Sequence, residues 1–278
     1  MNTTFILKFL ILLTFFTTIS CNSKDKSYFE QKEQQTSKSN KTRSNNSEKF
    51  LVPKILKIYP HDSKAYTQGL FYDNGYLYES TGLYGQSSLR KVDILTGNVL
   101  QRKSILPTYF AEGITKFGNN IYQLTWENKK GFIYDFNSFE KTGEFIYPTE
   151  GWGITTDNKS LIVSDGSNFL TFYNPTSFEI ENTISVQEGM QSVMNLNELE
   201  YVNGKIYANV YMTDDIVVIN PISGNVESKI DVSSLRMQLD NPNIAEVANG
   251  IAYNLETKTF YLTGKYWSNL FEVTFEER

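Results

Sequence analysis

A unit of about 45 residues recurs five times between residue 66 and the C-terminus, and this recurrence limits the fold more than any other feature of the sequence. Each copy opens with two short apolar segments separated by a turn of Asn, Gly or Asp, which is typical of a β-hairpin. The five hairpins cover residues 69–78, 113–122, 154–161, 199–206 and 251–260. A period of this length is typical of the blades of a β-propeller.

Further strands follow the hairpins and complete the expected unit. Third strands are predicted at residues 89–92, 132–136, 170–173 and 216–219, and fourth strands at 99–100, 180–184 and 226–230. Four strands in each of five copies predict an all-β fold, a five-bladed β-propeller with four-stranded antiparallel blades. The fifth copy ends with a strand at 270–275 and is one strand short, so we expect residues 52–59 to supply its outer strand and close the ring. A β-sandwich or two smaller sheets is the alternative, but neither explains a five-fold recurrence.

The composition permits a full-sized core and excludes several kinds of catalytic centre. The chain has 278 residues and is 40% hydrophobic, which is enough to bury a core. Its single cysteine, Cys21, rules out an intramolecular disulfide and a cysteine metal cluster. Its single histidine, His61, rules out a multi-histidine zinc site, and we expect it to be structural because it lies in a turn before the first blade.

The segment at 1–20 is typical of an export signal. Lys8 precedes an apolar run at 9–16 that is too short to span a bilayer. Cys21 follows a small residue, which resembles a bacterial lipoprotein signal with Cys21 as the acylated first residue of the mature protein. We therefore expect an exported protein that is lipid-anchored to a bacterial membrane, in the periplasm or at the cell surface. An ordinary signal peptide with an unused cysteine is the alternative.

Residues 21–50 are predicted to be a disordered polar tether between the signal and a folded body at 51–278. They contain almost no apolar side chains, so they cannot bury enough surface to offset the entropy of ordering. Residues 22–50 carry seven Lys and Arg against four Asp and Glu, whereas residues 51–278 carry eighteen against twenty-seven. Because an acidic body offers no basic surface for nucleic acid, we expect no nucleic-acid partner. We also expect the protein to be a monomer.

Two sets of equivalent positions in the repeat are expected to meet at one mouth of the propeller. The innermost strand of each blade lines the central channel, so the residues just before the first strands form a ring. This ring comprises Gln68, Glu112, Trp152, Asn197 and Asn249. The second strands return to the same mouth and end at Gly82, Trp126, Gly166, Tyr211 and Lys265. Polar groups that converge among aromatic walls, with small residues that leave room, are typical of a small-ligand pocket.

Each of these residues also has a simpler structural interpretation. A single aromatic residue at a strand end is more often packing than a ligand wall, and Lys265 alone is typical of a surface charge. Glu112 lies in apolar sequence, between Ala111 and Gly113. Its carboxyl group either has a raised pKa for acid/base chemistry or is a channel group hydrated by water.

Six segments of the body carry a more specific signal. They are 66–70 (Tyr-Thr-Gln-Gly-Leu), 79–88 (Glu-Ser-Thr-Gly-Leu-Tyr-Gly-Gln-Ser-Ser), 112–113 (Glu-Gly), 151–153 (Gly-Trp-Gly), 196–201 (Leu-Asn-Glu-Leu-Glu-Tyr) and 263–265 (Thr-Gly-Lys). Together they resemble the plant and bacterial type of glutaminyl-peptide cyclotransferase, the glutamine cyclotransferases of the papaya-latex type. The resemblance covers residues from about 51 to the C-terminus and implies nothing about the signal or the tether.

The resemblance implies a five-bladed propeller that converts the N-terminal glutamine of peptides or proteins to pyroglutamate and releases ammonia. It implies that Glu112 is the catalytic acid/base, and that the substrate-binding residues are Gln68, Trp126, Trp152, Asn197, Tyr211 and Lys265. Tyr211 departs from the family, which often has tryptophan at this position, so its hydroxyl group is expected to alter substrate preference or rate. The family uses no catalytic zinc, and no cofactor is expected for catalysis, although a structural Ca²⁺ in the channel is compatible with this function.

Two other functions stay open on the sequence alone. One is a tethered propeller that binds a ligand or a partner without catalysis. A mouth lined by one residue type would have supported this alternative, whereas the mouth predicted here is chemically mixed. The other is a metal-assisted, lactonase-like propeller that holds a hard cation such as Ca²⁺. The oxygen ligands would then be Glu112, Asn197, Glu198 and Asn249.

Overall fold

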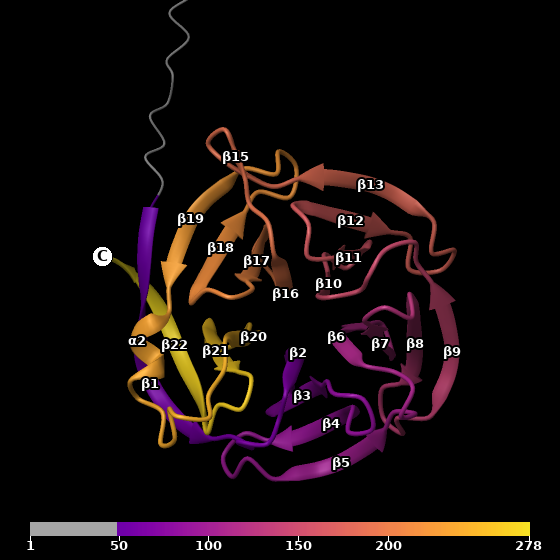
Figure 1. Ribbon diagram of the computed structural model, residues 1–278, viewed down its shortest axis with the longest axis horizontal. Helices are drawn as coiled ribbons and strands as arrows, with labels where there is room; N and C mark the ends of the chain where they lie inside the picture. Colours follow the sequence, from indigo (N-terminus) through magenta and orange to yellow (C-terminus); the bar gives the residue numbers. More distant parts are fainter. Residues whose placement is uncertain (1–48) are drawn as a thin grey trace, which may run out of the picture. The chain divides into compact units, whose positions relative to one another are not determined.

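The computed structural model describes residues 49–278, and these form an all-β body of short strands around a common centre (Figure 1). Three sheets have four antiparallel strands each. The first comprises β2 (Thr67–Asp73), β3 (Tyr76–Thr81), β4 (Ser88–Asp93) and β5 (Val99–Ser104). The second comprises β6 (Ala111–Phe117), β7 (Asn120–Thr125), β8 (Lys130–Asp135) and β9 (Lys141–Ile146). The third comprises β10 (Ile154–Thr156), β11 (Leu161–Ser164), β12 (Phe169–Tyr173) and β13 (Ile180–Ser185).

The remaining long strands form one mixed sheet of eight strands, in the order β16-β17-β18-β19-β1-β22-β21-β20. Its strands from the chain interior are β16 (Leu196–Val202), β17 (Lys205–Val210), β18 (Asp215–Ile219) and β19 (Val226–Asp231). Its other strands are β1 (Lys49–Pro60), β20 (Ala248–Asn254), β21 (Thr259–Gly264) and β22 (Asn269–Glu277). The five predicted hairpins and the predicted third and fourth strands are all confirmed.

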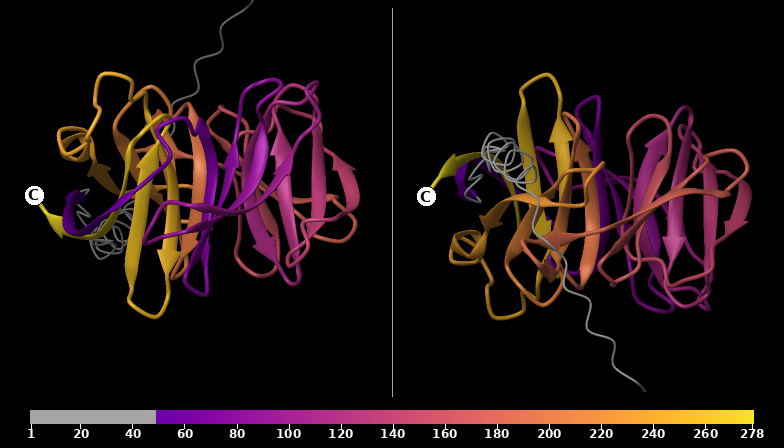
Figure 2. Two further views of the ribbon diagram at one scale, coloured as in Figure 1. Left: turned by 90° about the horizontal axis from the view of Figure 1, so that it is seen from below. Right: turned by 90° about the horizontal axis from the view of Figure 1, so that it is seen from above.

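The first and last strands of the body pair with each other. Strand β1 runs antiparallel to β22 along most of its length, and the two lie side by side in Figure 2. Its first three residues, Lys49 to Leu51, also pair in parallel with β19, which joins the two halves of the eight-stranded sheet. The predicted pairing of residues 52–59 with the C-terminal strand is therefore observed, and the strand begins at Lys49 rather than at residue 52.

Strand β9, which is the fourth strand of the second copy, was not predicted from the sequence, and neither were two small elements. One is a short hairpin of β14 (Gln187–Glu188) and β15 (Gln191–Ser192), and the other is a single helical turn, α2 (Ser233–Arg236), between β19 and β20. Within residues 49–278, no helix has the length and apolar character that crossing a membrane requires. The export signal, the lipidation of Cys21 and most of the tether lie outside the described residues and stay predictions.

In the three four-stranded sheets, burial falls from the first strand to the last. Strands β2, β6, β10, β16 and β20 lie nearest the centre in Figure 1, and β5, β9 and β13 lie at the periphery. The first five residues of β2 and of β6 are all buried, whereas β5 and β13 are mostly exposed. The sequences match these positions, because a strand that is buried on both faces needs small and apolar side chains.

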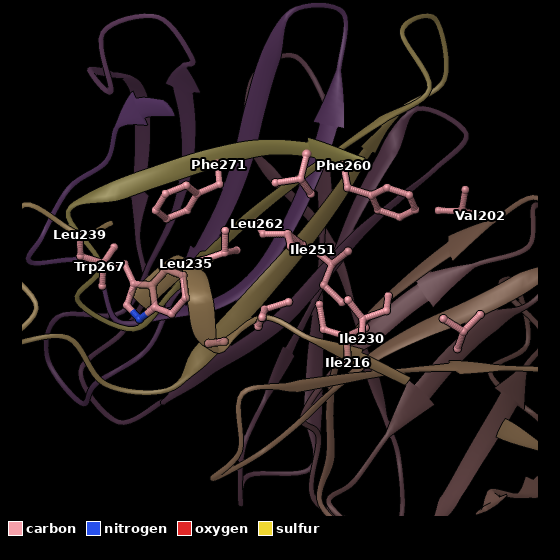
Figure 3. Close-up of a cluster of buried hydrophobic side chains, with 14 residues drawn as sticks. Val202, Ile216, Ile230, Leu235, Leu239, Ile251, Phe260, Leu262, Trp267 and Phe271 are labelled. Carbon is pink, nitrogen blue, oxygen red and sulfur yellow. The ribbon is translucent and has the colours of Figure 1, made fainter. Parts of the chain in front are cut away.

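Five clusters of buried hydrophobic side chains lie between neighbouring groups of strands. The largest packs Val202 and Ile230 from β16–β19 against Phe260, Leu262 and Phe271 from β20–β22 (Figure 3). Three others lie between successive sheets along the chain. The fifth joins the last strands to the first sheet, with side chains from β20–β22 packed on side chains from β2–β4. Each group of four strands is therefore buried against both of its neighbours.

His61 is the centre of a buried polar network that ties the first strands to the last, as expected for a structural histidine. Its Nε2 donates to Glu79 Oε1 at 3.0 Å, and its Nδ1 donates to the carbonyl oxygen of Trp267 at 2.7 Å. Burial lowers the pKa of His61, but the Glu79 carboxylate outweighs burial and the net pKa is raised. Two donating ring nitrogens and a raised pKa describe an imidazolium ion paired with a carboxylate.

Two glutamates of β16 satisfy backbone groups of other first strands. Glu198 accepts from the backbone N–H of Leu70 in β2 at 3.2 Å and of Ile251 in β20 at 2.8 Å. Glu200 accepts from the backbone N–H of Tyr253 at 3.1 Å. Burial raises the pKa of Glu198 well above its usual range, and burial raises the pKa of Glu200 to about 8. These carboxyl groups connect β16 to other first strands at the centre of the body.

Deletion of residues 51–59 should destabilise the whole body, because it removes the partner of β22 and leaves that strand with an open edge. We expect the midpoint of thermal unfolding to fall by roughly 10 °C or more. Differential scanning calorimetry of the truncated and full chains measures this shift. Deletion of residues 30–40, within the predicted tether, is the control and should leave the midpoint unchanged. Equal midpoints for all three proteins would contradict the role assigned to β1.

Replacement of Glu200 by Gln should remove a pH-dependent cost in stability. The pKa of Glu200 is about 8 in the folded state and about 4.5 in the unfolded state. Between these pH values the side chain is ionised only in the unfolded state, so the wild-type free energy of unfolding falls as pH rises. This decrease is up to about 1.4 kcal/mol per pH unit. Urea unfolding at pH 5 and pH 8 should show the Glu200→Gln variant gaining stability relative to wild type at the higher pH. A difference between the proteins that does not change with pH would overturn this assignment.

Candidate active site

Seven predicted site residues line one cavity of about 180 Å³. They are Gln68, Glu112, Trp126, Trp152, Asn197, Tyr211 and Lys265. Two further aromatic residues, Tyr66 and Phe110, complete the lining. The cavity is smaller than the roughly 300 Å³ at which drug-sized ligand sites begin, so its size suits a single amino-acid side chain.

A β-bulge interrupts four of the first strands, and in three of them a residue at the bulge lines this cavity. In β2 the pairing with β3 shifts register between Thr67 and Gly69, which leaves Gln68 outside the ladder. The same interruption occurs at Glu112 in β6, Asn197 in β16 and Asn249 in β20. Because a bulge bends the strand and re-aims the extra side chain, these polar residues turn out of the pleat of their own sheet.

Glu112 is the carboxyl group of the cavity, and it is 4% exposed. Its Oε1 accepts a hydrogen bond from Gln68 Nε2 at 2.8 Å. Asn249 orients that glutamine, because its Nδ2 donates to Gln68 Oε1 at 3.3 Å and to the carbonyl oxygen of Thr67 at 2.9 Å. Burial raises the pKa of Glu112 well above its usual range, although the Lys265 ammonium and the bond from Gln68 act in the opposite direction. The geometry therefore provides a buried carboxyl group whose pKa is raised well above that of an ordinary glutamate.

Lys265 is held between two aromatic rings. Its Nζ lies 4.6 Å from the ring centre of Tyr66 and 4.9 Å from that of Tyr211, and the residue is 2% exposed. Burial lowers the pKa of Lys265, while the carboxyl groups of Glu112 and Glu246 oppose this effect. The prediction that the lysine faces the aromatic residues is confirmed, and its alternative as a surface charge is wrong.

Asn197 presents an unused acceptor to the cavity. The residue is 2% exposed, and its Oδ1 has no hydrogen-bond partner among the described residues. Leaving such a buried oxygen unpaired costs about 1–3 kcal/mol, which a bound donor would recover. Asn249 also has an unpaired Oδ1, but it does not line the cavity and instead orients Gln68.

The two glycines predicted to leave room do so for neighbouring aromatic rings. A Cβ at Gly82 would clash with the ring of Phe110, and a Cβ at Gly166 would lie 2.6 Å from Cζ2 of Trp152. The rings of Phe110 and Trp152 therefore occupy the space beside the two glycines, so a ligand does not. The expectation that these two glycines leave room for a ligand is therefore wrong.

Tyr66 and Phe110 were not predicted as wall residues, although the sequence contains a signal for them. Each lies two residues before a ring residue, Gln68 or Glu112, on the same chain segment. Alternate residues of an extended chain point to the same side, so this position also faces the mouth. The two rings meet edge to face with centres 6.0 Å apart, and Phe110 meets Trp126 in the same way at 5.7 Å.

The residues suggested for a lactonase-like metal site do not come together. Glu112 and Asn197 line the cavity, whereas both oxygens of Glu198 accept from the backbone of β2 and β20. Asn249 is likewise outside the cavity lining. Across residues 49–278, no group of three or more His, Cys, Asp or Glu side chains is arranged to hold a metal ion.

Comparisons with known proteins agree with this arrangement. The family model for glutamine cyclotransferase matches residues 29–275. The chain is 37% identical over 227 residues to glutaminyl-peptide cyclotransferase of Arabidopsis thaliana, a match that covers 80% of this chain and 71% of that protein. It superposes on the crystal structure of Myxococcus xanthus glutaminyl cyclase with a TM-score of 0.78 and 34% identity, over 84% of this chain and 100% of that one. The chain therefore belongs to the glutamine cyclotransferase family.

Proposed function

We propose that this cavity is the active site of a glutaminyl-peptide cyclotransferase in which Glu112 is the catalytic acid/base. The observation that carries the proposal is the buried carboxyl group of Glu112, which has a raised pKa and faces a cavity sized for one side chain. The family membership and the names of both relatives support the same reaction.

In this reaction the α-amine of an N-terminal glutamine attacks the γ-carboxamide of the same residue. A C–N bond closes the five-membered lactam ring, and the bond from the carboxamide carbon to its nitrogen breaks to release ammonia. The amine nitrogen loses one proton and the departing nitrogen gains one, so no other reactant is needed. Since both reacting groups belong to one residue, the protein needs only to fold the side chain back and to move a proton.

Glu112 can carry that proton in either direction. Its Oε1 is occupied by Gln68, whereas no described residue donates a hydrogen bond to its Oε2. With its raised pKa, the protonated carboxyl group donates to the departing nitrogen and then accepts the proton of the attacking amine. Gln68 and Asn249 fix the plane of the carboxyl group during this exchange.

The other polar groups of the cavity orient the substrate. The unpaired Oδ1 of Asn197 is an acceptor for an N–H of the carboxamide or the amine. Lys265 stabilises the negative charge that develops on the carboxamide oxygen in the tetrahedral intermediate. The aromatic residues hold the aliphatic part of the side chain and exclude water. Only the first residue of a peptide fits this cavity, so the rest of the substrate must extend out through the mouth.

We also propose that the body is a five-bladed β-propeller whose ring is closed by β1. Under this proposal the eight-stranded sheet is two blades, β16–β19 and β20–β22 with β1, which are joined where Lys49 to Leu51 pair with β19. The cyclic series of five interior clusters supports this arrangement. We retain the proposals that the protein is exported and anchored through a lipid on Cys21, and that catalysis needs no metal ion.

The function predicts which peptides react. The purified body should release ammonia from a dipeptide that begins with Gln, and it should not react with the same dipeptide acetylated at the α-amine, because the nucleophile is then blocked. A coupled ammonia assay and mass spectrometry of the product measure both outcomes. Turnover of the acetylated peptide would point to an amidase and contradict cyclisation.

The variant Glu112→Gln tests the proton carrier. It keeps the shape and hydrogen-bonding capacity of the side chain but cannot transfer the proton, so we expect kcat to fall about 10²–10⁴-fold with little change in KM. Because burial raises the pKa of Glu112, the neutral amide should also melt no lower than wild type at pH 8. A structural role for Glu112 predicts the reverse pattern, with kcat near wild type and a lower melting temperature.

A further inference from the structure

The wall of the cavity is a nearly continuous chain of aromatic rings. Tyr66, Phe110 and Trp126 meet edge to face on one side. Trp152 and Tyr211 meet edge to face on the other, with ring centres 5.5 Å apart. Lys265 joins these two groups at one end, since it lies between the rings of Tyr66 and Tyr211.

A carboxylate joins the two groups at the other end. Glu150 Oε2 accepts a hydrogen bond from Trp126 Nε1 at 2.7 Å and a second from Trp152 Nε1 at 3.0 Å. The indoles come from different sheets, because Trp126 follows β7 and Trp152 precedes β10. The backbone N–H of Gly151 also donates to the carbonyl oxygen of Trp126 at 3.3 Å, so the segment that carries Glu150 is docked on the tryptophan it orients.

The position of Glu150 in the repeat is the same as that of two wall residues. Tyr66 lies two residues before Gln68, Phe110 lies two before Glu112, and Glu150 lies two before Trp152. Two of these equivalent positions thus contribute aromatic rings to the cavity. The third position, Glu150, contributes a hydrogen-bond acceptor for the indoles of Trp126 and Trp152, and Glu150 itself does not line the cavity.

We propose that Glu150 is a positioning residue of the cyclotransferase site, which sets the orientation of the two tryptophan walls through their indole N–H groups. This inference rests on the proposed function, because it assigns the walls to the binding of the glutamine side chain. An indole N–H can only donate, and a carboxylate oxygen can only accept, so one oxygen satisfies both donors without competition. Hydrogen bonds to an ionised acceptor are also shorter and stronger than neutral ones.

The charge of Glu150 has a second consequence, at Glu112. Its carboxylate contributes to the raised pKa of Glu112, after the larger effect of burial. The other charged group that faces Glu112 is Lys265, which acts in the opposite direction. Three tyrosines whose own pKa values are raised in part by Glu112 also surround it: Tyr66, Tyr84 and Tyr147. Loss of the Glu150 charge alone should therefore lower the pKa of Glu112.

Two variants separate the wall contacts from the charge. Glu150→Ala removes the oxygen that accepts from both indoles, so KM for a Gln-initiated peptide should rise by about tenfold or more while kcat changes less. Glu150→Gln keeps one acceptor oxygen, so KM should stay closer to wild type, but the basic limb of kcat/KM, where Glu112 loses its proton, should move to lower pH. Glu127→Gln is the matched control, because Glu127 is an exposed carboxylate next to Trp126 that makes no hydrogen bond to either indole.

Tryptophan fluorescence gives a readout that does not depend on turnover. The chain has three tryptophans, and the third, Trp267, is fully buried and serves as an internal reference. Acrylamide should quench Glu150→Ala more than wild type, since the two wall indoles lose their anchor, and should quench Glu127→Gln as it quenches wild type.

The outcomes distinguish this inference from the proposed function. A wild-type protein that releases no ammonia would contradict the proposed function, whereas the quenching comparison would still test whether Glu150 holds the indoles. Wild-type KM and wild-type quenching in Glu150→Ala would overturn the positioning role. A lower melting temperature in Glu150→Ala, with KM and the basic limb of kcat/KM unchanged, would show that Glu150 only stabilises the fold and would also overturn the positioning role.

Discussion

The close approach of the first strands at the centre of the body is the constraint on which the site depends. A Cβ at Gly113 would lie 2.7 Å from the backbone nitrogen of Ile154, and glycines 69 and 153 are equally crowded by the next strand. These positions admit almost no side chain, and at Gly69 and Gly113 the strand also bulges, so the preceding residue turns toward the mouth. The backbone geometry that packs the centre therefore also aims Gln68 and Glu112 into one cavity.

Strands β2 and β20 each lie at the end of a sheet, so one edge of each has backbone N–H groups without strand partners, and buried carboxyl groups satisfy several of these. Glu198 and Glu200 accept only backbone and hydroxyl donors, which makes them structural despite their raised pKa values. Glu112 differs because it accepts one side-chain bond and faces open space. A raised pKa alone thus does not identify a catalytic group among these three glutamates. The cavity and the unpaired oxygen of Asn197 make the distinction.

The repeat made most of the fold and the site predictable, because equivalent positions in a cyclic fold converge whatever their residue type. The period revealed the hairpins, the pairing of the chain ends and the seven cavity residues. It did not reveal Phe110 as the ring that fills the space beside Gly82, or Glu150 as the acceptor for two indoles. Such contacts depend on side-chain directions across different sheets, for which local sequence carries no periodic signal. Helix α2 was missed for a related reason, since four residues are too few to show helical periodicity.

The central claim is that burial raises the pKa of Glu112 well above the usual value for glutamate in the free enzyme. Infrared difference spectra between wild type and the Glu112→Gln variant, recorded across a pH titration, isolate the carboxyl stretch of this one side chain from those of Glu198 and Glu200. The account predicts a protonated carboxyl band that disappears only well above pH 4.5, the usual value for glutamate. If the band of the protonated Glu112 carboxyl group has already disappeared at pH 4.5, the claim is contradicted.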